Sequence, residues 1–369
     1  MNLTIAKEKL LHGLQAVQNV VSTRTTLPIL SNVLMKAEGN KMEFTATDLD
    51  VTINCTVEAT VKKKGATTIP VKRFFGVVRE LGSPEIELEV DEKHACSIRA
   101  GASFYKINGL SADEFPPIPK FKEDKKIIVP QEKMKSMLRK TSFAISTDES
   151  RYVLNGIFVI LKEHKMTMVA TDGRRLALVD EEVDIPENSQ GEFILPTKAV
   201  NEITRLLGDK GDVEMKFSEN QVSLSLADEK GNTAVVISKL VEGNYPNYKQ
   251  VIPSDTKERV ALPREEMLAA LRRAQIMTSD KANSVKLAFG RNNLAITANS
   301  PDVGEARETL AINYKGKDLQ IAFNPAYLID PLNVLTEDEV FLELIDELSP
   351  GVLKINGPFL YVVMPMRLS

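Results

Sequence analysis

The chain has 369 residues, of which 43% are hydrophobic and 27% charged, and its formal net charge is −4. This mixture is typical of a soluble protein with two or three domains, and no apolar run approaches the ~20 residues that a membrane span needs. Net acidity argues weakly against nucleic-acid binding without excluding it, because such binding depends on where the charges lie.

The N-terminal residues 1–14 alternate charged and aliphatic side chains at helical spacing. They lack the uninterrupted apolar core of a secretory signal. We therefore expect a cytoplasmic protein with no membrane partner.

The cysteines and histidines indicate neither redox nor metal chemistry. Cys55 shares one face of the strand-like segment 51–57, and Cys96 lies in a similar segment, so we expect both thiols to be buried as small hydrophobic groups. His12, His94 and His164 are far apart in the sequence and belong to no metal-ligand motif. We expect no metal and no cofactor.

One pattern of elements occurs three times, with a period near 125 residues. Each copy opens with an amphipathic helix that leads into a strand, and a hairpin partner follows that strand. A further strand then runs into a second helix. Thr47, Thr171 and Thr297 fall at one position of the pattern, separated by 124 and 126 residues. Because the period is too long for a solenoid, each copy is expected to be a domain.

The pattern predicts an α+β fold of three tandem domains, in which two helices pack on one side of antiparallel sheet in each copy. The polar, proline-marked segments 119–126 and 253–258 are read as linkers. The predicted domains are therefore 1–122, 127–253 and 259–369. Chance similarity among generic α+β segments is the alternative, and the recurrence of six elements in one order argues against it.

Basic charge is concentrated on the predicted helices. The six helices, at 7–19, 72–81, 131–145, 197–208, 264–275 and 325–336, sum to a formal charge of +7, which leaves −11 for the rest. Such helices on one side of curved domains would attract DNA phosphates without reading bases. Simple solvation of outer helix faces is the alternative.

The charge pattern suggests particular DNA-binding side chains on the outer helix faces. In the helix at 197–208, Glu202 is also expected to face outward. The helices carry no aromatic stacking platform, which disfavours single-stranded nucleic acid. The basic candidates are Lys72, Arg73, Arg139, Lys198 and Arg205.

Several motifs give the chain a full-length resemblance to a known family. They are Thr26-Leu-Pro-Ile-Leu30, Thr45-Ala-Thr-Asp48, Gly65-Ala-Thr-Thr68, Leu154-Asn-Gly156, Ala170-Thr-Asp-Gly-Arg-Arg-Leu-Ala177, Ser238-Lys-Leu-Val241 and Tyr361-Val-Val-Met-Pro-Met-Arg-Leu368. On these motifs the chain resembles the bacterial DNA polymerase III beta sliding clamp.

The resemblance implies three domains of the DNA-clamp fold and a six-domain ring formed by a head-to-tail homodimer. The ring would encircle duplex DNA, tether polymerases and confer processivity, without catalysis and without a cofactor of its own. An ATP-dependent clamp loader would place it on DNA. The resemblance also adds Arg24, whose position contacts DNA in the family.

The resemblance implies a dimer contact between domain three of one subunit and domain one of the other. Its candidate residues are Tyr105, Ile107, Ile276 and Met277. A place in the core of their own domains is the alternative for these four.

The resemblance also implies a hydrophobic cleft that receives short linear motifs of DNA polymerases, the clamp loader and other partners. Its residues are Leu154, Thr171, Gly173, Arg174, Arg175, Leu176, Pro246, Val251, Val362, Val363, Met364, Pro365, Met366 and Arg367. Methionines suit such a promiscuous surface, although Met364 and Met366 as buried filler is the alternative.

The sequence departs from the family pattern in places. Arg174 stands where a relative has histidine, Gln250 where it has arginine, and Ser369 extends the usual terminus. The first two departures concern the rim of the cleft and its peptide preference, and leave its apolar floor unchanged.

Two other functions are alternatives to a clamp. An enzyme would read Thr171-Asp-Gly173 as an acid at a turn, but Asp-Gly between strands is ordinary hairpin chemistry, and no nucleotide, hydrolase or metalloprotease motif occurs. A protein scaffold that never meets DNA is the second rival.

Overall fold

The computed structural model describes residues 1–21, 27–119, 121, 125–228, 231–280 and 283–367. The chain forms two compact units, and each is described by itself. Unit 1 comprises Met1–Lys135, Val183–Gln190 and Lys198–Val241, and unit 2 comprises Ser136–Glu182, Gly191–Thr197 and Glu242–Ser369. The predicted domain limits stay a prediction, because this division runs through the middle of the central repeat.

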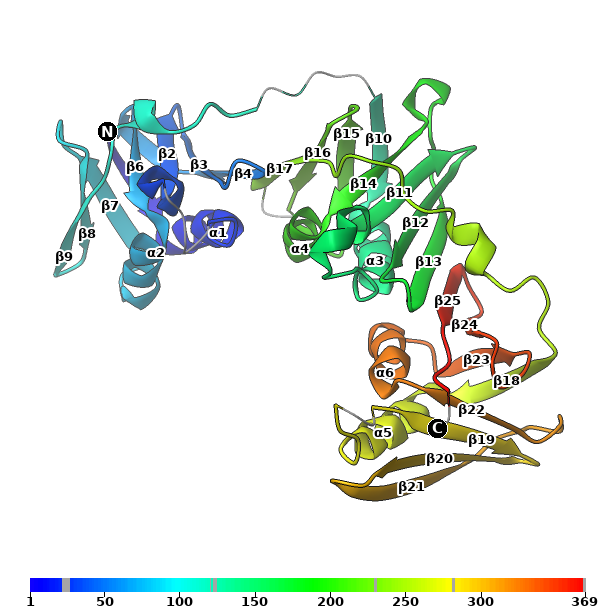
Figure 1. Cartoon of the computed structure of the whole chain (residues 1–369). Helices are drawn as coiled ribbons and strands as arrows, with labels where there is room; N and C mark the ends of the chain where they lie inside the picture. The colour runs from blue at the N-terminus through cyan, green and yellow to red at the C-terminus, as the bar shows by residue number, and fades with distance from the viewer. Residues whose placement is uncertain (22–26, 120, 122–124, 229–230, 281–282, 368–369) are drawn as a thin grey trace. The chain divides into compact units, whose positions relative to one another are not determined.

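All six predicted helices are present, and their ends lie within three residues of the predicted ones. They are α1 (Lys7–Val17), α2 (Val71–Glu80), α3 (Gln131–Ser142), α4 (Thr197–Leu206), α5 (Arg264–Gln275) and α6 (Pro325–Val334). In unit 1, α1 and α2 pack against each other, and in unit 2 α5 and α6 do the same (Figure 1). Short 3₁₀ segments are η1 (Pro28–Ser31), η2 (Ala112–Glu114), η3 (Glu149–Leu154), η4 (Glu187–Ser189) and η5 (Tyr248–Val251).

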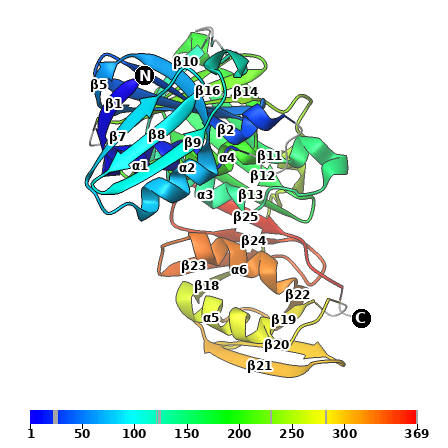
Figure 2. The ribbon, with the colours of Figure 1, turned by 90° about the vertical axis from the view of Figure 1, so that its left-hand side faces the viewer.

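Unit 1 contains two antiparallel sheets. The five-stranded sheet, seen at the upper left of Figure 2, has the order β5-β1-β7-β8-β9, and the eight-stranded sheet has the order β10-β15-β16-β17-β4-β3-β2-β6. Their strands are β1 (Asn2–Ala6), β2 (Asn32–Glu38), β3 (Lys41–Thr47), β4 (Val51–Glu58), β5 (Thr60–Lys63), β6 (Gly65–Pro70), β7 (Glu85–Val90), β8 (Ala95–Ala100), β9 (Ser103–Asn108), β10 (Lys125–Pro130), β15 (Asp212–Phe217), β16 (Gln221–Ala227) and β17 (Thr233–Lys239).

Unit 2 repeats this construction with an eight-stranded sheet, β14-β11-β12-β13-β25-β24-β23-β18, and a four-stranded sheet, β21-β20-β19-β22. Their strands are β11 (Gly156–Lys162), β12 (Lys165–Thr171), β13 (Arg175–Glu182), β14 (Gly191–Pro196), β18 (Glu258–Pro263), β19 (Val285–Gly290), β20 (Asn293–Ser300), β21 (Gly304–Ala311), β22 (Leu319–Phe323), β23 (Glu339–Leu344), β24 (Gly351–Lys354) and β25 (Phe359–Val363).

Each eight-stranded sheet joins strands of two consecutive repeats. In unit 1, β4 of the first repeat pairs with β17 of the second over six residue pairs, from Val51↔Ser238 to Thr56↔Thr233. In unit 2, β13 of the second repeat pairs with β25 of the third over five residue pairs, from Arg175↔Val363 to Val179↔Phe359. Backbone hydrogen bonds therefore hold neighbouring repeats together inside each unit.

Proline marks the passage from strand to helix in four places. Strands β6, β10, β14 and β18 end at Pro70, Pro130, Pro196 and Pro263, and a helix begins at the next residue each time. Proline has no N–H to donate to a ladder, so it suits the last strand position, and its fixed φ favours the turn into a helix.

The hairpins correct the predicted alignment of the third repeat. The two-residue turns leave Glu38 opposite Lys41, Lys162 opposite Lys165, and Gly290 opposite Asn293. Counting from these turns, Thr47 and Thr171 correspond to Asn299, and Thr297 corresponds to Thr45. The predicted match of Thr297 with Thr47 and Thr171 was wrong by two residues, a shift that keeps the side chain on the same strand face and so escapes a pattern of period two.

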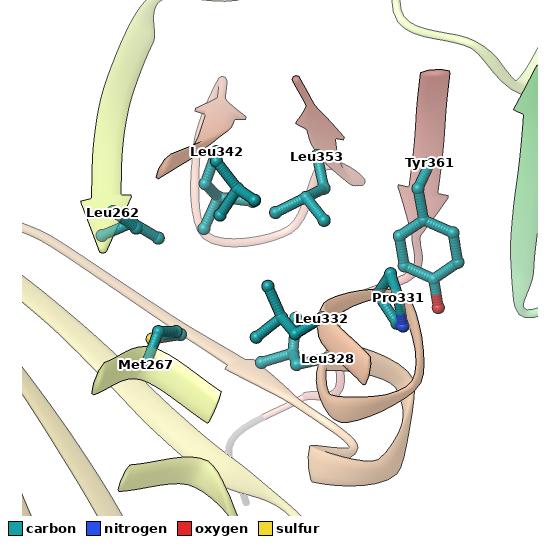
Figure 3. Close-up of a pocket in the computed structure, with 9 residues that line it drawn as sticks. Leu262, Met267, Leu328, Pro331, Leu332, Leu342, Leu353 and Tyr361 are labelled. Atoms are coloured by element: carbon teal, nitrogen blue, oxygen red, sulfur yellow. The ribbon is translucent and has the colours of Figure 1, made fainter. Parts of the chain in front are cut away.

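The core of the third repeat lies between its helices and the strands of unit 2. Leu342, Leu353 and Tyr361 project from the strands toward Leu328 and Leu332 of α6 and enclose a cavity of about 10 Å³ (Figure 3). The lining is almost wholly apolar, so a water there would find too few polar partners. The space is a packing defect of the core.

A pair of helix glycines tests how tightly the first repeat is packed. A Cβ on Gly13 of α1 would lie 2.5 Å from ring carbons of the buried Phe44, whereas a Cβ on Gly76 of α2 would meet nothing within 4 Å. We expect Gly13→Ala to lower the free energy of unfolding by about 1–3 kcal/mol, because overpacking outweighs helix propensity. Gly76→Ala is expected to raise it by about 0.5–1 kcal/mol.

Urea denaturation of the two variants, followed by circular dichroism, measures both changes. Equal stabilisation by both substitutions would contradict the close approach of α1 to Phe44.

Candidate functional site

The candidate site centres on the β13–β25 strand pair of unit 2. Arg175 lies opposite Val363, and Leu176 lies opposite Val362, so each pair shares one face of the sheet. Tyr361 donates a hydrogen bond from its hydroxyl to Tyr327 O of α6 at 2.7 Å. By strand alternation, Tyr361, Val363 and Arg175 therefore face the helices, and Leu176 and Val362 face the other side.

The face of the sheet that lies away from α6 carries an apolar cluster. Val169, Leu176 and Val362 are buried at its centre, and Phe158, Leu178, Tyr245, Tyr248, Ile252 and Leu360 pack around them. Phe158 and Tyr245 stack with ring centroids 4.8 Å apart and an interplanar angle of 8°. The segment that contains η5 thus covers part of this face with aromatic side chains.

Large apolar side chains remain exposed on segments next to this cluster. Val251 is 50% exposed, Met364 44% and Met366 38%. Met364 N donates to Arg174 O at 2.9 Å, which holds the chain after β25 beside the β12–β13 hairpin. We call Leu176, Val251, Val362, Met364 and Met366 the apolar surface; its exposed members lie next to a buried floor, as expected of a binding surface.

The other predicted cleft residues differ in their exposure. Leu154 is buried, Thr171 and Pro365 are half-buried, and Gly173, Arg174, Pro246 and Arg367 are exposed. Thr171 Oγ1 donates to Arg175 O at 2.6 Å, and Gly173 has a φ of +87°, which favours glycine at this turn. The hairpin is therefore held in a single shape by its own Thr-Asp-Gly sequence.

Two predicted cleft residues point to the opposite face of the sheet. Val363 is fully buried on the helix side with Tyr361. The side chain of Arg175 also lies on the helix side, where it binds Asp330 of α6. A motif match does not show on which face of a strand a side chain lies, so the resemblance assigned both residues to the cleft.

Arg175 binds several groups at once. Its Nε donates to Asp172 at 3.0 Å, its Nη2 donates to Phe143 O at 2.7 Å, and its Nη1 donates to Asp330 of α6. Its guanidinium carbon also lies 4.6 Å from the ring centroid of Tyr327. Burial alone would lower the pKa of Arg175, but the hydrogen bond to Asp330 and the negative charges nearby raise it overall.

Three of the predicted DNA-binding side chains are free to meet a ligand. Lys72 and Arg73 are exposed on α2 of unit 1, and Arg139 is exposed on α3 in unit 2. Among the residues that the structure describes, none of the three has an ion pair or a side-chain hydrogen bond. Arg24, expected to touch DNA, lies outside the described residues.

The other two predicted DNA-binding cations have partners within unit 1. Lys198 pairs with Asp48. Arg205 donates to Ala16 O at 2.6 Å and to Glu202 at 2.6 Å. Glu202, expected to face outward, is buried instead, because α4 packs its polar face against the end of α1.

The predicted dimer residues lie near two sheet edges. Strand β9 is an edge of the five-stranded sheet of unit 1, and β21 is an edge of the four-stranded sheet of unit 2. Tyr105 of β9 is exposed, whereas Ile107 is only 6% exposed and belongs to the core of its own unit. Ile276, just after α5, is 73% exposed, and Met277 is half-buried.

Family models match the chain in three consecutive segments. They describe the N-terminal domain of the DNA polymerase III beta subunit at residues 1–119, its central domain at 128–247 and its C-terminal domain at 249–367. The chain belongs to the beta sliding clamp family.

Relatives and solved structures agree over the full length. The chain is 35% identical to the beta sliding clamp of Chlamydia pneumoniae over 368 residues, which cover 100% of this chain and 99% of that protein. It is 30% identical to that of Bacillus subtilis, with 100% of each chain covered. The crystal structure of the Bartonella birtlesii clamp bound to griselimycin is similar with a TM-score of 0.94 and 36% identity, covering 100% of both chains.

Family membership confirms two predictions. The fold consists of three tandem clamp domains with two helices each, and the chain is a non-catalytic subunit of a DNA polymerase. In the part of the chain that the structure describes, no helix is long and apolar enough to cross a membrane, and no cluster of three potential metal ligands occurs.

Sequence reasoning about this clamp missed several aromatic residues. Tyr245 and Tyr248 cover the outer face of the sheet, and Tyr152 is exposed on η3. No periodic pattern could have revealed Tyr245 and Tyr248, because the segment before η5 is neither helix nor strand. Burial raises the pKa of the Tyr245 hydroxyl, which approaches the Thr171 backbone without forming a well-oriented hydrogen bond.

Both cysteines of the clamp are buried in strands, as predicted. Burial raises the pKa of Cys55 and of Cys96 to about 12 each. At pH 8 the reactive thiolate is therefore scarce, roughly one molecule in 10⁴ for such a pKa, and the thiol itself is covered.

We expect neither thiol to react appreciably with a disulfide reagent in the folded clamp at pH 8, and both to react within minutes in guanidinium chloride. Spectrophotometric titration of released thiolate measures this. Rapid reaction of one thiol in the folded protein would contradict its burial.

Proposed function

We propose that the chain acts in the cytoplasm as a closed ring of two subunits that encircles duplex DNA and tethers DNA polymerases to it. The observation that carries this proposal is the full-length family match in three consecutive domains. We retain 1–122, 127–253 and 259–369 as the proposed domain limits. Processivity would be topological: the ring stays on DNA because it cannot leave a closed duplex without opening.

Ring closure requires a head-to-tail contact between unlike surfaces of the two subunits. Strands β9 and β21, which are sheet edges among the residues that the structure describes, support this contact, because edge strands can add to one another through main-chain hydrogen bonds. Exposed Phe104 and Tyr105 lie on β9, and exposed Ile276 follows α5, which packs against β21; all three supply apolar area. Ile107 would contribute indirectly, because its buried side chain holds β9 on the core. Met277 is half-buried, so only part of its side chain could take part in the contact.

Contacts to DNA would be weak, mobile and independent of sequence. Lys72, Arg73 and Arg139 support this because their cations are exposed and unpaired among the described residues. Arg24 joins them through the family resemblance. Screened contacts of this kind centre a duplex and still permit sliding. Lys198 and Arg205 would contribute less, because each already has partners within unit 1.

Polymerases, the clamp loader and other partners would bind the apolar surface through short motifs with aliphatic or aromatic ends. Met364 and Met366 adapt to varied side chains, and the exposed Arg174 and Gln250 would set the preference at the rim. ATP would be used by the loader, since the sequence contains no nucleotide-binding motif.

A topological assay tests the ring. Clamp loaded onto nicked circular DNA with loader and ATP should stay bound through gel filtration at physiological salt. Linearising the DNA should release nearly all of it within minutes, because a ring slides off free ends. Scintillation counting of labelled clamp that elutes with DNA gives the retained fraction.

Ile276→Glu serves as the control, because a charge at an exposed apolar contact should weaken the dimer without unfolding the subunit. Light scattering should give a lower mass for it, and the assay should show little retention on circles. Equal retention of the original clamp on circular and linear DNA would contradict the proposal that it forms a closed ring.

The apolar surface is tested with a fluorescent peptide that carries a polymerase clamp-binding motif. We expect Met364→Ala to weaken binding about tenfold, since truncating a central apolar contact costs about 1–2 kcal/mol. Leu348→Ala is the matched control, because Leu348 is also an exposed apolar residue of unit 2 but lies in the turn between β23 and β24. Similar affinities of the two variants in a polarisation assay would refute the assignment.

A further inference from the structure

The β3–β4 hairpin of the first repeat and the β12–β13 hairpin of the second have the same pattern of hydrogen bonds at their turns. In the first, Asp48 Oδ1 accepts the backbone N–H groups of Asp50 and Val51 at 3.1 and 2.8 Å. In the second, Asp172 Oδ1 accepts those of Arg174 and Arg175 at 2.9 and 3.1 Å. In each case one carboxylate oxygen caps the turn, and the other oxygen remains available.

The available oxygen binds a cation in both hairpins. Asp48 Oδ2 accepts from Lys198 Nζ, and Asp172 Oδ2 accepts from Arg175 Nε at 3.0 Å. Lys198 lies on α4, the second helix of the following repeat. Arg175 lies on the hairpin itself and reaches Asp330 on α6, again the second helix of the following repeat. In the first case the helix carries the cation and the hairpin the anion, and in the second case the hairpin carries the cation and the helix the anion. In both cases a hairpin of one repeat is joined to the second helix of the next.

Each cation also binds the segment that leaves the first helix of the earlier repeat. Lys198 Nζ donates to Val20 O at 2.9 Å, three residues after α1. Arg175 Nη2 donates to Phe143 O at 2.7 Å, one residue after α3. One side chain therefore holds three elements at each junction, two from one repeat and one from the next.

The corresponding hairpin of the third repeat, between β20 and β21, lacks the carboxylate. Counted from the β19–β20 turn, the position of Asp48 and Asp172 belongs to Ser300. The helix position of Lys198, two residues after the strand-ending Pro196, is held in the first repeat by Lys72, two residues after Pro70. Lys72 is exposed and without a charged partner in the described residues.

We propose that Lys198 and Arg175 are equivalent junction residues, each of which fastens the second helix of one repeat to the hairpin and first-helix exit of the repeat before it. They are positioning residues of the chain. This assignment concerns the junctions within one subunit and is independent of ring closure and of partner binding.

The surroundings indicate which junction is the stronger. The Arg175 side chain is 11% exposed and binds two carboxylates and a carbonyl, whereas the Lys198 side chain is 39% exposed. Solvent therefore screens the ion pair of Lys198 more than the ion pairs of Arg175. Removing one partner of the buried set also leaves charges without compensation, so the Arg175 junction should respond more strongly.

Hydrogen exchange measured by mass spectrometry tests the first junction. In Lys198→Met, peptides from the α1 exit at 17–21 and from the hairpin at 47–52 should exchange about fivefold faster than in the original protein, as expected of a partly exposed pair. Lys72→Met is the matched control, because it removes the same charge from the same helix position. It should leave both peptides unchanged.

A double-mutant cycle tests the second junction with the same method. Arg175→Gln and Asp330→Asn should each speed exchange in α6 and around Phe143 by about tenfold or more. The double variant should exchange at least threefold more slowly than the product of the single effects predicts, because the two side chains act through one contact. Arg175→Lys should exchange more slowly than Arg175→Gln, because lysine keeps the positive charge but lacks the planar guanidinium that donates to several partners at once.

Circular dichroism and light scattering of every variant verify folding and assembly. Unchanged exchange at the α1 exit in Lys198→Met, with a fall in DNA retention equal to that of Lys72→Met, would make Lys198 a phosphate-binding residue and overturn the proposal. Independent effects of Arg175→Gln and Asp330→Asn would do the same for the second junction.

Discussion

Antiparallel pairing between strands of consecutive repeats is the interaction on which the rest of the structure depends. Through β4–β17 and β13–β25, the backbone ladder of one repeat continues into the next. Strand register is strongly specified wherever one face is buried, because a slip of one residue would turn every apolar side chain to the opposite face. Neighbouring repeats are thereby fixed by main-chain geometry, which few side-chain substitutions can alter.

This pairing also builds the apolar surface. Leu176 comes from the second repeat and Val362 from the third, and they become neighbours only because β13 and β25 pair. The helix side of the same two strands carries Arg175 and Tyr361, which bind α6. One strand pair therefore serves two purposes on its two faces: a buried polar contact on one and an apolar platform on the other.

Much of this arrangement could be predicted from the sequence. The repeat, the six helices and the buried strand cysteines follow from periodicity and from order along the chain, which are local properties. What could not be predicted depends on which elements of different repeats meet. Glu202 was expected to face solvent because its helix position is polar, but α4 packs that side on the end of α1. Ile107 and Val363 match family positions, yet their strand faces turn them inward.

The place of the central repeat between the two others has a consequence for its isolated form. Its strand β17 pairs with β4 of the first repeat, and its strand β13 pairs with β25 of the third. An excised central repeat would therefore expose backbone N–H and C=O groups along both β13 and β17. Such edges are templates for pairing with another chain, so the excised repeat would tend to associate.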